Sequence, residues 1–149
     1  KGVERRFSHL FNHNNISFYD DYAHHPTEIS SVLSGVKNVH KNKEIVCIFQ
    51  PHRISRVIYL KKEFSKCFKK ADTVLLCPIY TANEKLRLNF TYNSFAKLII
   101  KNSNVKLIQV DNEKQLRSFI RHNAFGKKIY IGMGAGSISN WMKDLKNIF

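Results

Sequence analysis

The regular alternation of short apolar runs with stretches of helical spacing is the feature that most limits how this chain can fold. Five apolar runs suit buried strands: 16–21, 44–49, 73–78, 105–110 and 128–132. An earlier strand at about 5–11 can pair with 16–21 through the turn His-Asn-Asn, so we expect this pair to be antiparallel. These runs predict a sheet of about six strands.

The segments between the runs carry apolar residues at helical spacing. Pro26 suits the first position of the first helix, and Ser55 is the expected N-cap of the second. The apolar stripes are, in chain order, Ile29, Val32, Leu33 and Val36; Val57, Leu60, Phe64 and Phe68; Phe95 and Ile99; Leu116, Phe119 and Ile120; and Ile138, Trp141, Met142 and Leu145 behind Ser137. Repeated strand–helix units of about 25–30 residues indicate a parallel sheet with helices on both faces. We therefore predict a single α/β domain over residues 1–149.

The charge of the chain is strongly positive. Lys and Arg number 25 against 11 Asp and Glu, a formal net charge of +14. Such an excess suggests an anionic partner, for which nucleic acid is the general default. The lysines are nevertheless spread through every segment and form no basic stripe interleaved with aromatic residues. We therefore do not expect a nucleic-acid partner, and a small phosphorylated substrate would account for some of the arginines.

The composition indicates in which compartment the chain resides and whether it could span a membrane. No apolar run approaches the roughly 18 residues of a membrane span, and the polar, basic opening does not resemble a signal peptide. The opening looks like a chain cut from something longer. Cys47, Cys67 and Cys77 are odd in number and far apart, and two lie in apolar runs. This pattern favours plain packing in a reducing compartment over a disulfide or a metal site.

Polar clusters follow two of the predicted strands. DDYAHHPTEI at 20–29 and QPHRISR at 50–56 both leave the carboxyl edge of the sheet, where ligands bind in open α/β folds. Arg53 and Arg56 also lie near a helix start, where the macrodipole disfavours cations, so they suggest an anion between them. A solvated helix start is the alternative. For the adjacent histidines, ligand contact or an inert loop is favoured over a metal site.

A glycine cluster, GMGAGS at 132–137, joins the last predicted strand to the last helix. A strand–glycine–helix context lets backbone N–H groups approach an anion, but tight strand–helix packing is the favoured reading. The alternating glycines do not form the dinucleotide fingerprint. No G-x-x-x-x-G-K-[ST] motif occurs in the chain, so it cannot hold a triphosphate in a P-loop by itself.

Four motifs together carry a family resemblance. DDYAHHPTEI, FQPHRISR, IYTANE and GMGAGSI, in this order, resemble the C-terminal domain of the Mur ligases, and the similarity runs from GVERRF at 2–7 to the final helix. PHRISR is similar to the members that add L-alanine to UDP-N-acetylmuramate in peptidoglycan synthesis. The murein-tripeptide ligases differ there and are the alternative within the family. A basic nucleic-acid-binding module and a free-standing nucleotide-binding or regulatory domain are the alternatives outside it.

The resemblance implies a Rossmann-like, amino-acid-binding domain of a cytoplasmic, ATP-dependent enzyme. Its N-terminal UDP-sugar domain and central ATPase domain would lie outside this chain, and the central domain would hold most of ATP and Mg2+. ATP would convert the muramoyl carboxylate to an acyl phosphate, and the amino group of L-alanine would attack it. No catalytic residue and no metal ligand is therefore expected in this segment.

The resemblance also assigns individual residues. Asp21 is similar to the aspartate that holds the ATP ribose, and Arg6 to the arginine that reaches the γ-phosphate. The residues around the alanyl group are matched by Tyr22, His24, Arg53 and Arg56. The two arginines would take the carboxylate of the amino acid, and His52 matches a neighbouring residue. One loop would thus carry a nucleotide half-site at Asp21 and an amino-acid half-site beside it.

Three positions depart from the family pattern. Ile54 stands where tyrosine is more usual, Ala23 where glycine is usual, and Ser137 where aspartate is usual. None of these changes removes a charged ligand group. Ala23 requires a negative φ to avoid backbone strain.

Overall fold

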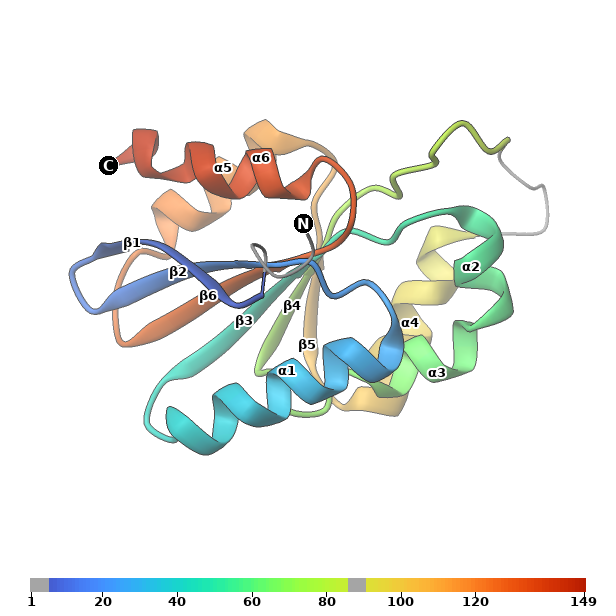
Figure 1. Ribbon diagram of the computed structural model, residues 1–149, viewed down its shortest axis with the longest axis horizontal. Helices are drawn as coiled ribbons and strands as arrows, with labels where there is room; N and C mark the ends of the chain where they lie inside the picture. Colours follow the sequence, from blue (N-terminus) through green and yellow to red (C-terminus); the bar gives the residue numbers. More distant parts are fainter. Residues whose placement is uncertain (1–5, 86–90) are drawn as a thin grey trace.

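Six strands form one sheet at the centre of the structure, a computed structural model that describes residues 6–85 and 91–149 (Figure 1). The strands are β1 (Ser8–His13), β2 (Ile16–Asp21), β3 (Glu44–Phe49), β4 (Thr73–Leu76), β5 (Lys106–Gln109) and β6 (Lys128–Met133). Their order in the sheet is β1-β2-β6-β3-β4-β5. β1 pairs antiparallel with β2, and the other neighbours are parallel. The predicted α/β class and the antiparallel N-terminal strand are confirmed.

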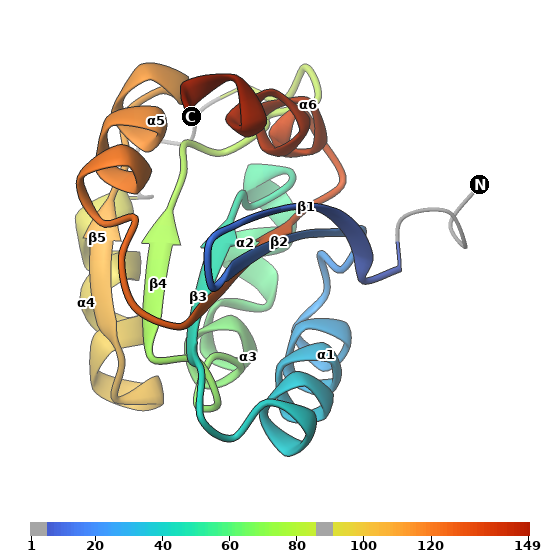
Figure 2. The ribbon, with the colours of Figure 1, turned by 90° about the vertical axis from the view of Figure 1, so that its left-hand side faces the viewer.

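Helices cover both faces of this sheet. They are α1 (Pro26–Val39), α2 (Ile54–Tyr59), α3 (Lys61–Lys66), α4 (Tyr92–Ser103), α5 (Glu113–His122), α6 (Ile138–Asp144) and the short 3-10 helix η2 (Leu145–Ile148). α1 to α4 pack on one face, and α5, α6 and η2 on the other (Figure 1). Figure 2 shows the sheet from its side, with β4 and β5 far from the β1–β2 hairpin. None of the helices in the described ranges is long and apolar enough to cross a membrane.

The central strands are apolar throughout because both of their faces are buried. In β3, Ile45, Cys47 and Phe49 belong to the core beneath α1 to α4, while Val46 and Ile48 belong to the core beneath α5 and α6. Successive side chains of a strand point to opposite faces, so one continuous apolar run supplies two cores. This explains why the strand runs in the sequence are uninterrupted.

The predicted helix start is correct for α1 but not for α2. Pro26 is the first residue of α1, as predicted. The prediction that Ser55 caps the second helix is wrong: the N-cap is Arg53, and the single expected helix is two short helices that meet at Leu60. The reason lies outside the local sequence, because the Ser55 hydroxyl donates a hydrogen bond to Glu84. The apolar stripe is still buried, as Val57 illustrates.

Element bounds differ slightly from the prediction elsewhere. β1 begins at Ser8, later than the expected 5–11, and residue 5 lies outside the described residues. The expected irregular connection at 79–90 is confirmed over 79–85, where only a single bridge joins Tyr80 to His52. Its remainder, 86–90, lies outside the described residues.

The two cores predict that the chain unfolds in one cooperative transition. Phe64 is fully buried, and truncation of a buried aromatic residue costs about 3–5 kcal/mol. Phe64→Ala is therefore expected to lower the melting temperature by roughly 6–20 °C. Tyr59, which is 85% exposed on the preceding helix, is the control, and Tyr59→Ala should leave the transition unchanged. Circular dichroism would measure both, and a gradual transition in the parent chain would contradict the expectation.

Candidate functional site

Three loops meet at the carboxyl ends of neighbouring parallel strands. β6 lies between β2 and β3, so the residues that follow these strands, 22–25, 50–53 and 134–137, leave the same edge of the sheet (Figure 1). The expectation that the two polar clusters share one edge is confirmed. Two of the cavities near this edge contain the residues that the family resemblance assigns to ligands.

The first cavity, called here the arginine pocket, has a volume of about 600 Å³. Its lining residues are Tyr22, His24, His52, Arg53, Ser55, Arg56, Tyr59, Leu60 and Ala135. The structure therefore brings together the whole set that the family resemblance places around the amino acid. These residues come from the loop after β2 and from the chain that leads from β3 into α2. Their contact with a ligand stays a prediction.

The backbone at Arg53 turns the chain sharply from β3 into α2. Arg53 has φ 69° and ψ 127°, a sparsely populated backbone conformation that costs a non-glycine residue about 1–3 kcal/mol. Its N–H donates to the carbonyl of Tyr80 at 2.8 Å, and its own carbonyl accepts from Val57 at 3.2 Å. Two backbone hydrogen bonds thus hold this conformation. A non-glycine residue retained in such a conformation is typical of a functional site.

The arginine pocket carries uncompensated positive charge. Neither Arg53 nor Arg56 forms an ion pair with any residue of the described ranges 6–85 and 91–149. The expected opposition to the helix macrodipole concerns Arg53 alone, because α2 has only 6 residues and Arg56 lies in its last turn. A pair of free guanidinium groups is suited to bidentate binding of a carboxylate or a phosphate.

His52 adds a neutral ring to this pocket. Burial lowers its pKa, and the nearby Arg56, His24 and Arg53 lower the pKa further, so the imidazole is uncharged at neutral pH. The ring stacks on Tyr80, with centroids 5.5 Å apart and planes 11° apart. Its Nδ1 atom is buried and has no hydrogen-bond partner among the described residues. His52 therefore shapes the wall of the pocket without adding charge.

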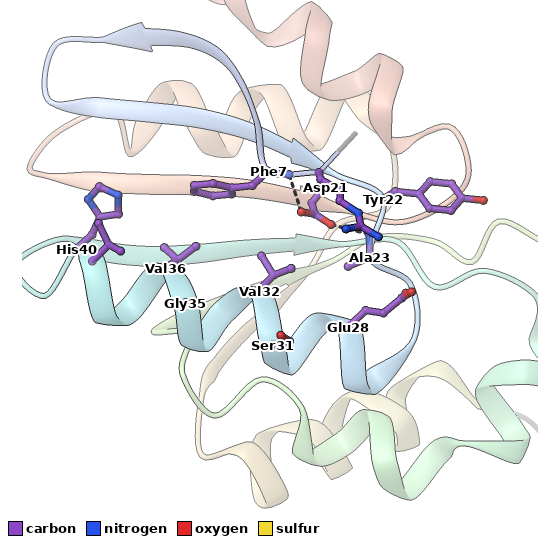
Figure 3. Close-up of a pocket in the computed structure, with 12 residues that line it drawn as sticks. Phe7, Asp21, Tyr22, Ala23, Glu28, Ser31, Val32, Gly35, Val36 and His40 are labelled. Carbon is purple, nitrogen blue, oxygen red and sulfur yellow. Dashed lines mark hydrogen bonds between the residues drawn. The ribbon is translucent and has the colours of Figure 1, made fainter. Parts of the chain in front are cut away.

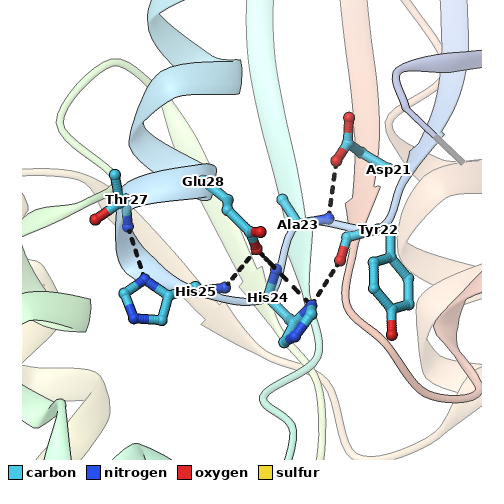
Figure 4. A network of polar contacts seen from close by, with 7 residues as sticks. All are labelled: Asp21, Tyr22, Ala23, His24, His25, Thr27 and Glu28. Atoms are coloured by element: carbon cyan, nitrogen blue, oxygen red, sulfur yellow. Dashed lines mark hydrogen bonds and ion pairs between the residues drawn. The ribbon is translucent and has the colours of Figure 1, made fainter. Parts of the chain in front are cut away.

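The two adjacent histidines of the first loop do different things (Figure 4). His24 Nδ1 donates to the Tyr22 carbonyl at 2.8 Å, which leaves Nε2 as an acceptor in the neutral ring. His25 caps α1: its Nδ1 accepts from Thr27 N–H at 3.4 Å, and Glu28 accepts from the His25 N–H at 3.2 Å. Only His24 lines the arginine pocket, so His25 fits the reading of a structural loop residue.

The second cavity, called here the α1 pocket, lies between Phe7 and α1 and has a volume of about 520 Å³ (Figure 3). Its lining includes Arg6 and Asp21, the two residues that the resemblance assigns to ATP. Val32 and Val36 form an apolar wall along the helix. The cavity thus combines the carboxylates of Asp21 and Glu28, the guanidinium of Arg6 and an apolar surface.

Asp21 is buried at the mouth of the α1 pocket and is held by two backbone groups. Oδ2 accepts from Phe7 N–H at 2.7 Å, and Oδ1 accepts from Ala23 N–H at 2.8 Å. Burial raises the pKa of Asp21, against the lowering effect of these two hydrogen bonds. Each oxygen keeps a further lone pair, so the carboxylate can still accept from a ligand hydroxyl. Ala23 has a negative φ, so its departure from glycine causes no strain.

Tyr22 separates the two cavities. It lines both of them, and Figure 3 shows its ring directed away from the α1 pocket. The end of β2 therefore presents Asp21 to one cavity, and the loop that follows presents His24 to the other. The predicted placement of two half-sites on one loop agrees with this geometry.

The glycine cluster serves close packing. A Cβ atom at Gly134, where φ is +153°, would lie 2.9 Å from the Gln50 carbonyl oxygen, and one at Gly136 would lie 2.5 Å from Cγ of Tyr80. The first N–H group of α6 already has an acceptor, because Ile138 N–H donates to Gln50 Oε1 at 3.0 Å. Gln50 Nε2 also donates to the Ser137 hydroxyl at 2.9 Å. The favoured packing reading of these glycines therefore fits the structure.

Comparison with known proteins decides the family. The sequence model of the family described as Mur ligase, glutamate ligase domain, matches residues 5–136. This chain belongs to the Mur ligase family. A relative from Pelagibacter ubique, a UDP-N-acetylmuramate–L-alanine ligase, is 62% identical over 148 residues, which are 99% of this chain and 32% of the relative. The Mur ligase domain thus spans about a third of the length of the curated relatives it matches.

Solved structures agree with the fold of the Mur ligase domain. A UDP-N-acetylmuramate–alanine ligase from Thermotoga maritima is 27% identical, with a TM-score of 0.69 over 96% of this chain and 29% of its own. A murein peptide ligase from Psychrobacter arcticus is 18% identical, with a TM-score of 0.75 over 97% of this chain and 30% of its own. The second likeness concerns the fold alone.

Two residues of this Mur ligase domain hold the loops of the site together, although the family resemblance assigned them no role. Gln50 ties the glycine loop to the end of β3, and Glu84 accepts hydrogen bonds from Ser55 across 29 residues of sequence. Local periodicity carries no information about such distant partners. The motif IYTANE, which contains Glu84, was the available signal, although the resemblance assigned it no role.

Proposed function

We propose that this domain is the amino-acid-binding, C-terminal part of an ATP-dependent ligase that adds L-alanine to UDP-N-acetylmuramate. The UDP-sugar domain and the central ATPase domain would be supplied by the rest of a longer protein. The arginine pocket carries the proposal, because its two guanidinium groups are free of ion pairs with any described residue. The 62% identity to an L-alanine ligase supports this substrate over that of the murein-tripeptide ligases.

In the proposed reaction, Arg53 and Arg56 bind the carboxylate of L-alanine. This leaves the amino group directed out of the pocket, where it attacks the acyl phosphate of the muramoyl group and displaces phosphate to form the amide. The uncharged His52 ring and the side chain of His24 line the same cavity, so both can contact the bound amino acid. The pocket thus binds and orients, and it requires no nucleophile of its own.

The α1 pocket supports a contribution to nucleotide binding. We assign the ATP ribose to Asp21, whose oxygens retain acceptor capacity, and the γ-phosphate to Arg6. Bound ATP with Mg2+ would activate the muramoyl carboxylate. No cluster of three His, Cys, Asp or Glu that could hold a metal ion occurs in the described part of the chain. Following the family resemblance, we assign the Mg2+ ligands to the central domain.

A cytoplasmic location is part of the proposal. Cys47, Cys67 and Cys77 are buried free thiols, which suits a reducing compartment. ATP is the energy source of the proposed reaction, and the cytoplasm supplies it. The amide bond would be the first peptide link of a cell-wall precursor.

The experiment that tests the function compares the longer protein with the 149-residue chain. The longer protein should release phosphate from ATP only when both UDP-N-acetylmuramate and L-alanine are present. The 149-residue chain alone should release none, because it lacks the P-loop that supplies most of the stabilisation in phosphoryl transfer. Phosphate release would be followed under identical conditions for both proteins.

Two outcomes would contradict this expectation. Phosphate release by the isolated chain that disappears in Asp21→Ala would show that the chain has a catalytic site of its own. Release by the longer protein that depends on a different amino acid would exclude L-alanine as the substrate. Strongly salt-dependent binding of the chain to DNA or RNA would instead favour a nucleic-acid-binding module.

A further inference from the structure

We propose that Glu84 is a positioning residue for the arginine pocket: it holds the start of α2 so that Arg53 and Arg56 face the carboxylate of the amino acid. The proposal rests on the proposed function, which places that carboxylate in the arginine pocket. Glu84 itself does not line this cavity. It acts through Ser55, which does.

Both oxygens of the Glu84 carboxylate are bound to Ser55. Oε1 accepts from the Ser55 N–H at 3.0 Å, and Oε2 accepts from the Ser55 hydroxyl at 2.5 Å. The first N–H groups of a helix have no partner within the helix. The side chain of the N-cap, Arg53, makes no capping hydrogen bond within the described chain. Glu84 therefore supplies the cap of α2 from a distant segment.

A tight turn aims Glu84 at this helix. The Glu84 N–H donates to the Thr81 carbonyl at 3.0 Å, and the two residues between them, Ala82 and Asn83, have φ values of 52° and 71°. Two successive positive φ angles are the pattern of a type I′ turn. The chain thus reverses over residues 81–84 and brings the carboxylate back to the start of α2.

The same segment also holds the residues before α2. Tyr80 N–H donates to the Pro51 carbonyl at 2.8 Å, and Arg53 N–H donates to the Tyr80 carbonyl at 2.8 Å. The Tyr80 ring stacks on His52. Arg53 is therefore held on both sides. The Tyr80 carbonyl accepts from the N–H of Arg53, and the Glu84 carboxylate accepts from the N–H of Ser55, two residues later. These hydrogen bonds explain how Arg53, which is not a glycine, keeps a positive φ angle.

Glu84 carries a negative charge near the arginines but, among the described residues, does not pair with them. The Ser55 hydroxyl lowers the pKa of Glu84 most, followed by the Ser55 N–H, with smaller contributions from Ile54 N–H and Arg53. Glu84 is thus ionised at neutral pH. It forms no ion pair with Arg53 or Arg56 in the described structure, so both guanidinium groups stay available for a ligand.

Kinetics of the full-length ligase test the proposal. Loss of a helix cap corresponds to a change of about 2- to 30-fold in an equilibrium constant, so Glu84→Ala should raise KM for L-alanine by about that factor. KM for ATP should change less than twofold on the same scale. Ser55→Ala should act in the same direction, and the double variant should be no worse than the more severe single variant. Glu84→Gln keeps one acceptor for the Ser55 N–H and should recover part of the loss.

Glu113→Ala is the matched control. Glu113 is also half-buried and forms an ion pair with Arg117, at 3.3 Å on α5. α5 lies on the opposite face of the sheet from α2, so both KM values should stay unchanged.

Hydrogen exchange provides a readout that does not depend on activity. In the 149-residue chain, Glu84→Ala should accelerate exchange of the Ser55 amide by about 2- to 30-fold. Amides of β3 and β6 should keep their parent rates. Glu113→Ala should leave the Ser55 amide unchanged. These rates report whether Glu84 holds the start of α2.

The two readouts separate the possible failures. Faster exchange with an unchanged KM for L-alanine would overturn the positioning role and leave the proposed function intact. Equal losses for ATP and L-alanine would overturn it in favour of a general effect on the fold. A third outcome would assign Glu84 a direct contact with the amino acid. In that case Glu84→Gln would raise KM for L-alanine as much as Glu84→Ala does, while the Ser55 amide would exchange at the parent rate. If the parent enzyme shows no dependence on L-alanine, the proposed function fails, and unchanged exchange would then also overturn the role of Glu84.

Discussion

Arg53→Ala in the full-length ligase is expected to raise KM for L-alanine about 10- to 150-fold. The physical reason is the loss of one charge-assisted hydrogen bond to the carboxylate, which is worth roughly 1.5–3 kcal/mol. Within the described residues, Arg53 has no ion pair that could compete for its guanidinium group, so the loss falls on the ligand. KM for ATP should change much less, because Asp21 and Arg6 line a separate cavity. Initial rates against each substrate would measure both constants.

Two further variants sharpen this test. Arg53→Lys should rescue only part of the loss, because an ammonium group cannot reproduce the planar fork of a guanidinium. Arg121→Ala removes another exposed arginine, in the last turn of α5, and should leave both KM values unchanged. Equal losses for ATP and L-alanine in Arg53→Ala would mean that Arg53 serves domain closure and not amino-acid binding.

Asp21→Ala is expected to have the converse effect and raise KM for ATP about 10- to 150-fold. The substitution removes the carboxylate and with it the charge-assisted hydrogen bond to the ribose, again worth roughly 1.5–3 kcal/mol. KM for L-alanine should change less, because Asp21 does not line the arginine pocket. Burial raises the pKa of Asp21, so on acidification the carboxylate is protonated at a higher pH than a free aspartate. ATP binding by the parent enzyme should therefore weaken as the pH falls through this raised pKa.

Stability must be measured beside these rates. Asp21→Ala also leaves the N–H groups of Phe7 and Ala23 without their acceptor, which costs about 1–3 kcal/mol for each buried group. Asp20 is the matched control: it is the neighbouring buried aspartate, but its Oδ2 accepts from Ser139 at 2.7 Å on the opposite face of the sheet. Asp20→Ala should lower the melting temperature without raising KM for ATP. A similar rise in KM for both variants would assign the effect to the fold.

Much of the fold was open to prediction because it depends on local patterns. Continuous apolar runs mark strands buried on two faces, and spacing of 3 and 4 residues marks helices, so the six strands and the position of Pro26 followed from the sequence. The shared edge of the two polar clusters followed as well, because parallel strands align their carboxyl ends. The assignment of Tyr22, His24 and Arg53 to one site came from the family resemblance, and their common cavity agrees with it.

Contacts between distant segments were not open to prediction in this way. Ser55 has the side chain of an N-cap, yet its hydroxyl donates to Glu84, a residue 29 positions away. Of two adjacent histidines, His25 caps α1 and His24 faces the arginine pocket, a division that depends on backbone direction after β2. Identical residue types thus received different roles from their surroundings.

The sequence by itself therefore determined which segments supply the core, that helices cover both faces of the sheet and which edge of the sheet carries the polar loops. Hydrophobic burial at fixed periods decides these properties, and it can be read from one segment at a time. The tertiary structure alone decided that Tyr22 separates two cavities and that Glu84 caps the helix bearing Arg56. Hydrogen bonds and cavities require atoms from several segments within a few ångströms of one another, and only the packed chain brings those segments together.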